Sequence, residues 1–219
     1  MKTIELILSK MNILYHSVFF IEIGASDGIY NDLLYPYITK HDWEGILVEP
    51  NRDMFLKLIN NYNGYYKLYF ENIAVSENYS RKNLYMVNYD KYKRELTKHI
   101  SSLDRTNLIR HKVPERDIIS KEVECVPYDH LLKKYFVKKY DILYLNTEGY
   151  NRIILSQAVR CNPTPKIILY ETERRLNEEV QEIENLLSRY DYNIIKTKTH
   201  NYHFKNEKTN INSSSNIEE

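Results

Sequence analysis

The stretch VFFIEIGASDGIYNDL, residues 18–33, limits what this chain can fold into more than any other. Residues 18–23 are apolar except for Glu22, and their β-branched and aromatic side chains are typical of a strand covered on both faces in a parallel sheet. Gly24 and Gly28 then predict a turn whose backbone N–H groups point outward and can approach a polar ligand closely. We therefore expect a buried strand that runs directly into a ligand-binding turn.

Strands and helices alternate along the rest of the chain. Further strands are predicted at 44–50, 65–70, 122–126, 140–146 and 166–171. Helices are predicted at 2–16, 32–40, 51–61, 129–138, 153–159 and 173–190. Asn51 is the predicted N-cap of the helix that ends at Asn61. A closing antiparallel hairpin is expected from 192–196 and 202–205. This order predicts one α/β domain over residues 1–205, with a doubly wound and mostly parallel sheet.

Two segments lack this regular pattern. Residues 76–120 are strongly charged, and only 84–87 within them predict a strand, so we expect an irregular insertion that carries the specificity for a substrate. Residues 206–219 are mainly Asn, Ser, Lys and Glu, with isoleucine as their only apolar residue type, and they predict a disordered tail.

Composition narrows the classes of function and location. The net charge of +1 gives no electrostatic argument for a nucleic acid or an anionic membrane as the partner. No apolar run is long enough to span a membrane and no signal peptide is evident, so a cytoplasmic protein is expected. Cys125 and Cys161 have no paired spacing, which indicates neither a disulfide framework nor a zinc site and leads us to expect no metal.

The ends of the first three predicted strands indicate a cofactor. The Gly24–Gly28 turn, Glu49 and residues 71–74 would meet at the carboxyl edge of a parallel sheet, where such sheets bind ligands. A carboxylate after the second strand is placed to accept hydrogen bonds from both hydroxyls of a ribose. A dinucleotide would need a third glycine near its pyrophosphate, whereas S-adenosylmethionine has no phosphate and carries a cationic sulfonium suited to Asp27 and Glu22. The cofactor predicted here is therefore S-adenosylmethionine.

Eight stretches of the chain resemble the FkbM family of S-adenosylmethionine-dependent methyltransferases. They are FIEIGASDGIYND, GILVEPN, ENIAVSE, SSLDR, VECVPYDHLL, DILYLNTEGYNRIIL, KIILYETE and HNYHF, in the family's order from about residue 18 to 205. The resemblance implies the Rossmann-like class I methyltransferase fold. It also implies transfer of a methyl group to an oxygen, often the hydroxyl of a sugar, a glycan or another small molecule.

The same resemblance implies roles for individual residues. The cofactor-binding positions would be Glu22, Gly24, Ala25, Asp27, Gly28, Glu49, Pro50, Asn72, Ile73 and Ala74. The catalytic positions would be Asn146, Glu148, His99 and Asp104, of which the last three are candidates for a general base. Ser102 and Glu171 would contact the substrate.

Asn146 departs from the family's pattern, which usually has an aspartate there. If that aspartate accepts a proton, this protein would be weak or inactive; if it orients the acceptor hydroxyl, the amide oxygen of Asn146 could serve. We favour orientation, because alignment of the reacting groups can contribute up to roughly 7–11 kcal/mol. Two alternatives remain open: a nucleic-acid methyltransferase that uses the basic residues between 91 and 112, and a degenerate protein that only binds or acts as a scaffold.

Overall fold

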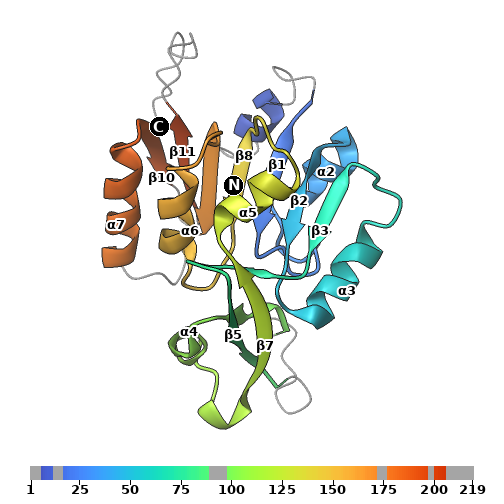
Figure 1. Cartoon of the computed structure of the whole chain (residues 1–219), viewed down its shortest axis with the longest axis vertical. Helices are drawn as coiled ribbons and strands as arrows, with labels where there is room; N and C mark the ends of the chain where they lie inside the picture. Colours follow the sequence, from blue (N-terminus) through green and yellow to red (C-terminus); the bar gives the residue numbers. More distant parts are fainter. Residues whose placement is uncertain (1–5, 12–16, 89–97, 172–176, 197–199, 206–219) are drawn as a thin grey trace.

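The computed structural model of this chain describes residues 6–11, 17–88, 98–171, 177–196 and 200–205. The tail predicted as disordered, 206–219, lies outside the described residues. Of the helix predicted at 2–16, the described part is helical at residues 6–11. Figure 1 shows helices packed on both faces of a central sheet, with a second, smaller sheet below it.

Seven strands form the main sheet of the described residues, in the order β10-β11-β9-β8-β1-β2-β3. Their bounds are Phe19–Ile23 (β1), Glu44–Val48 (β2), Leu68–Glu71 (β3), Ile142–Leu145 (β8), Ile167–Glu171 (β9), Tyr192–Lys196 (β10) and His200–Lys205 (β11). Neighbouring strands are parallel except around β11, which is antiparallel to β9 and β10. This arrangement confirms the predicted doubly wound, mostly parallel sheet with a C-terminal antiparallel hairpin.

Helices cover the two faces of this sheet because side chains alternate along its buried strands. Phe20 packs into one cluster and Ile21 into the other. The Phe20 face is covered by α2 (Tyr35–His41) and α3 (Arg52–Asn61), and the Ile21 face by α5 (Tyr128–Lys134), α6 (Asn151–Ala158) and α7 (Asn177–Ser188). Asn51 caps α3 by accepting the backbone N–H of Asp53 at 3.1 Å, as its sequence position predicted.

A second sheet, with the strand order β4-β7-β5-β6, is formed by strands within residues 74–88 and 98–126, which we call the second sheet region. The strands are Ala74–Val75 (β4), Ser80–Val87 (β5), Ser101–Ser102 (β6) and Ile118–Val126 (β7), with helix α4 (Arg105–Arg110) and the 3₁₀ turn η2 (Glu115–Asp117) between β6 and β7. The strands predicted at 84–87 and 122–126 are present, but both begin earlier than predicted, at Ser80 and Ile118. Most side chains in the first half of β5 and the middle of β7 are exposed, so these segments lack the alternation that a half-buried strand shows.

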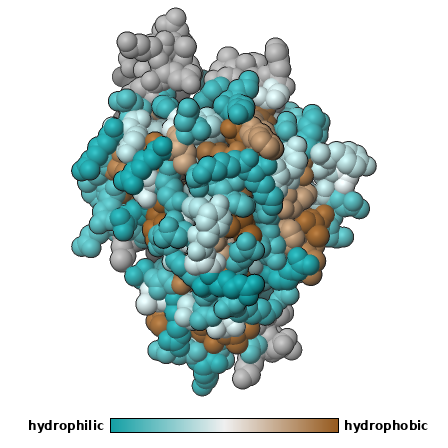
Figure 2. Space-filling model, viewed as in Figure 1, coloured by the Kyte–Doolittle hydropathy of each residue, from teal (hydrophilic) through white to brown (hydrophobic). Residues whose placement is uncertain are grey.

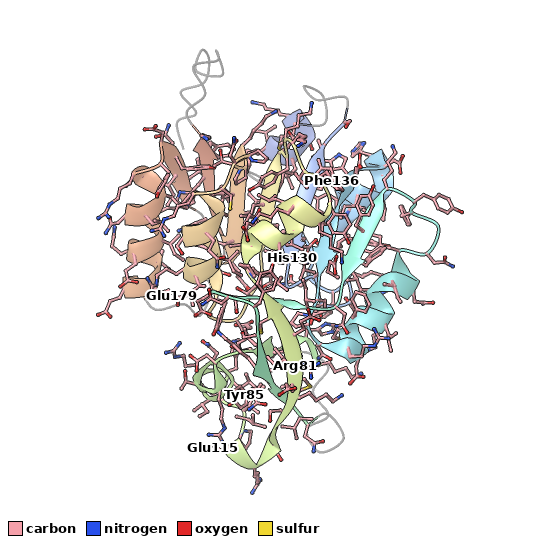
Figure 3. All side chains as sticks on the ribbon, in the orientation of Figure 1. Arg81, Tyr85, Glu115, His130, Phe136 and Glu179 are labelled. Carbon is pink, nitrogen blue, oxygen red and sulfur yellow. The ribbon has the colours of Figure 1, made fainter. Side chains whose placement is uncertain are left out.

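The surface in Figure 2 is mostly hydrophilic, with apolar residues scattered over it. No helix among the described residues combines the length and the apolar character that crossing a bilayer requires.

Candidate active site

A cavity of about 320 Å³ lies at the carboxyl edge of the main sheet, between this edge and the second sheet. The turns after β1, β2 and β8 contribute one side, and residues of the second sheet contribute the other. The volume is at the lower end of the range for small-molecule sites. Nine of the residues predicted from the sequence line it: Gly24, Glu49, Pro50, Ala74, His99, Ser102, Asn146, Glu148 and Glu171.

Gly24 allows the turn after β1 to lie directly against the turn after β8. Its φ is +88°, and a Cβ atom added to it would lie 2.3 Å from the carbonyl oxygen of Asn146. Both the backbone conformation and the close approach therefore require glycine. Ser26 in the same turn has a φ of +50°, which directs its backbone N–H toward Glu49.

Glu49 follows β2 directly and is only 4% exposed. Its Oε2 accepts the backbone N–H of Ser26 at 2.8 Å, and its Oε1 accepts that of Asn51 at 2.7 Å. Burial raises the pKa of Glu49 to about 7, although the two backbone hydrogen bonds act in the opposite direction. Each carboxylate oxygen retains acceptor capacity beyond these bonds, so this side chain can accept hydrogen bonds from a ligand in the cavity.

Glu22 and Asp32 lie outside the residues that line the cavity. Burial, followed by the charges of Asp32 and Glu49, raises the pKa of Glu22 well above its usual range. Burial likewise raises the pKa of Asp32 to about 7, against the hydrogen bonds that it accepts from Leu34 and Tyr35. Within the described residues, Glu22 Oε2 and Asp32 Oδ2 have no hydrogen-bond partner. Both groups therefore favour the protonated state more than exposed carboxyls do.

The other predicted residues outside the lining support the turns. Asp27 Oδ1 accepts the backbone N–H groups of Ile29 and Tyr30, and the Asn72 amide donates to the carbonyl oxygens of Glu49 and Pro50. Asp104 caps α4 by accepting the N–H of Thr106 at 2.9 Å. The complete set of predicted residues that do not line the cavity is Glu22, Ala25, Asp27, Gly28, Asn72, Ile73 and Asp104.

His99 connects the second sheet region to the turn after β1. Its Nδ1 lies 2.8 Å from Ser26 Oγ, within hydrogen-bond distance, and its ring stacks on Tyr30 with centroids 4.2 Å apart and planes 14° apart. All three side chains line the cavity. These contacts hold His99 against the turn after β1 in the wall of the cavity.

The turn after β8 is held by α4 and the residues before it. Ser102 Oγ donates to the Glu148 carbonyl oxygen at 2.5 Å and accepts the N–H of Asp104 at 2.9 Å. A Cβ atom at Gly149, whose φ is +96°, would lie 2.2 Å from the Asn107 amide nitrogen. His111, directly after α4, lies with its Nε2 3.0 Å from Glu148 Oε2. The stretches SSLDR and NTEG therefore meet in space.

Twelve lining residues were absent from the sequence predictions, and four of them have polar or titratable side chains that bear on the chemistry of the site: Ser26, Tyr30, His111 and Tyr150. Ser26 and Tyr30 lie in or next to the glycine turn, so their proximity to the predicted site was a usable signal. His111 and Tyr150 have no local pattern that marks them, since the two sheets must form before they reach the cavity.

The charge of the cavity distinguishes among ligands. The lining residues include three carboxylates, Glu49, Glu148 and Glu171, and neither lysine nor arginine among those that the structure describes. Likewise, no group of three or more His, Cys, Asp or Glu in the described ranges is arranged to hold a metal ion. Such a cavity suits a cationic or neutral ligand and is unfavourable for a pyrophosphate. A cationic sulfonium attached to adenosine fits this set of groups.

Comparisons with known proteins show which family and which solved structures this chain is similar to. A model of the methyltransferase FkbM domain matches residues 22–194. The structure of methyltransferase FkbM from Methylobacillus flagellatus KT is similar, with a TM-score of 0.53 and 16% identity over 86% of this chain and 44% of that one. This chain therefore spans less than half of that protein. Precorrin-6y C5,15-methyltransferase from Geobacter metallireducens GS-15 aligns with a TM-score of 0.47 and 9% identity over 92% of this chain and 85% of that one. A search of curated proteins found no match.

Proposed function

Because this chain belongs to the FkbM methyltransferase family and is a methyltransferase with the class I fold, we propose that it methylates a hydroxyl group of a sugar, a glycan or another small molecule, using S-adenosylmethionine. The proposal rests on the position and the hydrogen bonds of Glu49. A buried carboxylate, fixed by two backbone N–H groups at the end of β2, lies in the wall of a cavity that lacks lysine and arginine among its described residues.

The residues of the cavity match the parts of this cofactor. Glu49 would accept the ribose hydroxyls, and the turn from Gly24 to Gly28 would lie against the cofactor through its backbone. Pro50, Ala74 and Val75 contribute apolar surface to the cavity lining. When bound, S-adenosylmethionine supplies an electrophilic methyl group on a sulfonium, which the carboxylates of the cavity stabilise electrostatically.

The acceptor is proposed to be neutral because the charge of the cavity disfavours phosphate. Glu148 and Glu171 line the cavity and could accept hydrogen bonds from hydroxyl groups, as could the amide oxygen of Asn146. Held in this way, an acceptor hydroxyl would be oriented without first losing its proton. Asn146 in place of an aspartate is compatible with that orienting role.

The nucleic-acid alternative has less support from the described residues. Lys91, Lys93 and Arg94 lie outside them. Arg105 pairs with Glu115 at 2.8 Å, and Arg110 donates to the Asn107 side chain at 3.0 Å. These two cations thus have partners within the second sheet region.

A methyl-transfer assay tests the proposal. The protein is incubated with S-adenosylmethionine tritiated on the methyl group and, separately, with the methyl glycosides of glucose, galactose, mannose, rhamnose and fucose or with single-stranded and duplex RNA. We expect label in at least one glycoside and none in RNA. Label in RNA alone, with binding that weakens steeply between low and moderate salt, would favour the nucleic-acid alternative. Binding of S-adenosylhomocysteine without any transfer would favour a degenerate binding protein.

A further inference from the structure

A hydrogen-bond contact between the side chains of His111 and Glu148 joins the second sheet region to the main sheet at the cavity. The Nε2 of His111 lies 3.0 Å from Glu148 Oε2, and the two side chains are 9% and 19% exposed. His111 follows α4 in the second sheet region, whereas Glu148 follows β8 in the main sheet, and both line the cavity. The pair is thus largely shielded from bulk water and lies in the wall of the cavity.

Both partners are held from the backbone. The N–H of His111 donates to the Asn107 carbonyl oxygen at 3.0 Å, which fixes the residue at the end of α4. The carbonyl oxygen of Glu148 accepts the Ser102 hydroxyl at 2.5 Å, and Asn107 packs against Gly149. These contacts fix the backbone positions from which the two side chains extend. A histidine held against a carboxylate at a cavity wall is an arrangement that serves proton transfer.

We propose that His111 is a catalytic residue that accepts the proton of the acceptor hydroxyl, and that Glu148 positions its ring; this inference rests on the proposed function. The hydroxyl oxygen forms a bond to the methyl carbon as the carbon–sulfur bond breaks and leaves its electron pair on sulfur. The hydroxyl proton passes to the neutral imidazole and afterwards to solvent. The carboxylate of Glu148 stabilises the imidazolium so formed.

The other candidates for a proton acceptor have different surroundings. His99 is engaged with Ser26 and stacked on Tyr30, on the side of the cavity next to the cofactor turn. Asp104 caps α4 and does not line the cavity. The remaining titratable side chains that line the cavity are Tyr30, Glu49, Tyr150 and Glu171, and the charged residues beside His111 on its own segment are Arg110 and Lys112. Among these groups, His111 combines a carboxylate partner, Glu148, with a place in the cavity lining.

The test compares His111→Gln with His130→Gln. Glutamine keeps a hydrogen-bond donor for Glu148 but accepts no proton in this pH range. His130 is a matched control because it lies on α5, outside the cavity lining, with its Nδ1 3.2 Å from the Tyr79 hydroxyl. With the glycoside that the wild type methylates, His111→Gln should lower kcat by roughly 10²–10⁴-fold and abolish the acid limb of the pH–rate profile. His130→Gln should retain the wild-type kcat and the acid limb of the pH–rate profile.

A second readout is independent of turnover. In the complex with S-adenosylhomocysteine, addition of the same glycoside should shift the imidazole resonance of ¹³C-labelled His111, assigned by its absence in His111→Gln, and leave that of His130 in place. An unshifted resonance, or a variant with wild-type kcat and pH profile, overturns the inference alone. A wild type that binds S-adenosylhomocysteine but methylates no glycoside overturns the proposed function and this inference together.

Discussion

The carboxylate of Glu49 accepts the backbone N–H of Ser26 at 2.8 Å and so joins the end of β2 to the turn after β1. The hydroxyl of Ser26 lies 2.8 Å from His99 Nδ1, which extends the same connection to the second sheet region. One residue in a left-handed conformation thus links the proposed ribose-binding carboxylate to the opposite wall of the cavity. A substitution at any of these three residues is therefore expected to change the affinity of the proposed cofactor site.

Gly24→Ala should destabilise the protein more than Gly64→Ala. Both glycines have positive φ, +88° and +94°, so both variants carry the strain of a left-handed alanine, about 1 kcal/mol. Only at Gly24 does the added Cβ meet backbone, 2.3 Å from the Asn146 carbonyl oxygen, whereas nothing lies within 4 Å at Gly64. Urea denaturation should show the difference, and calorimetry should show loss of S-adenosylhomocysteine binding only in Gly24→Ala. Equal stabilities would mean that the two turns do not lie in contact.

Asp32→Asn should stabilise the protein at alkaline pH. Burial raises the pKa of Asp32 to about 7, above its value in the unfolded chain, so the folded state binds more protons between about pH 4 and 7. The stability that this group contributes is therefore present at low pH and is lost as the pH rises through 7. Asparagine has no charge to bury and keeps an oxygen for the backbone N–H of Leu34.

Denaturation at pH 5.5 and pH 8 measures this effect. We expect Asp32→Asn to exceed the wild type by about 1–3 kcal/mol at pH 8 and by less at pH 5.5. Asp191→Asn is the control, because Asp191 is exposed and its φ of +62° suits asparagine. A variant that is less stable than the wild type at pH 8 would show that the Asp32 carboxylate is stabilised in the folded state.

Ser102→Ala should loosen the turn that carries Glu148. The buried hydroxyl donates to the Glu148 carbonyl oxygen and accepts the Asp104 N–H, and its removal leaves both groups without this partner, at a cost of about 1–3 kcal/mol. We expect slower methyl transfer with a smaller change in cofactor affinity. Ser80→Ala, which removes an exposed hydroxyl, should cost less than about 0.5 kcal/mol. If the two variants had equal effects on stability and rate, Ser102 would not be the residue that holds the turn carrying Glu148.

The parts of the fold that depend on local patterns could be predicted from the sequence. The strand and turn at residues 18–28 and the cap at Asn51 are encoded by neighbouring residues, and the structure has them where expected. The position of Glu49 could also be predicted, because a residue that directly follows a buried parallel strand lies at the carboxyl edge of the sheet, independent of the conformation of the neighbouring loops.

The second sheet and His111 could not be predicted in this way. The first half of β5 is exposed, so its pairing with β7 leaves little hydrophobic alternation to detect. His111 and Glu148 are far apart in the chain and lie in turns after α4 and β8, and the sequence around His111 is an ordinary charged segment. Contacts of this kind depend on how two sheets pack, which no local pattern contains.

Calorimetric titration with S-adenosylhomocysteine of the wild type, Glu49→Ala and Glu44→Ala tests the central claim most directly. Glu44 is the matched control because it begins β2, whereas Glu49 follows its last residue. We predict that the wild type and Glu44→Ala bind equally and that Glu49→Ala loses about 1.5–3 kcal/mol, roughly 10- to 150-fold in affinity, through lost charge-assisted hydrogen bonds to the ribose. Failure of the wild type to bind either S-adenosylhomocysteine or S-adenosylmethionine at millimolar concentration would contradict the account.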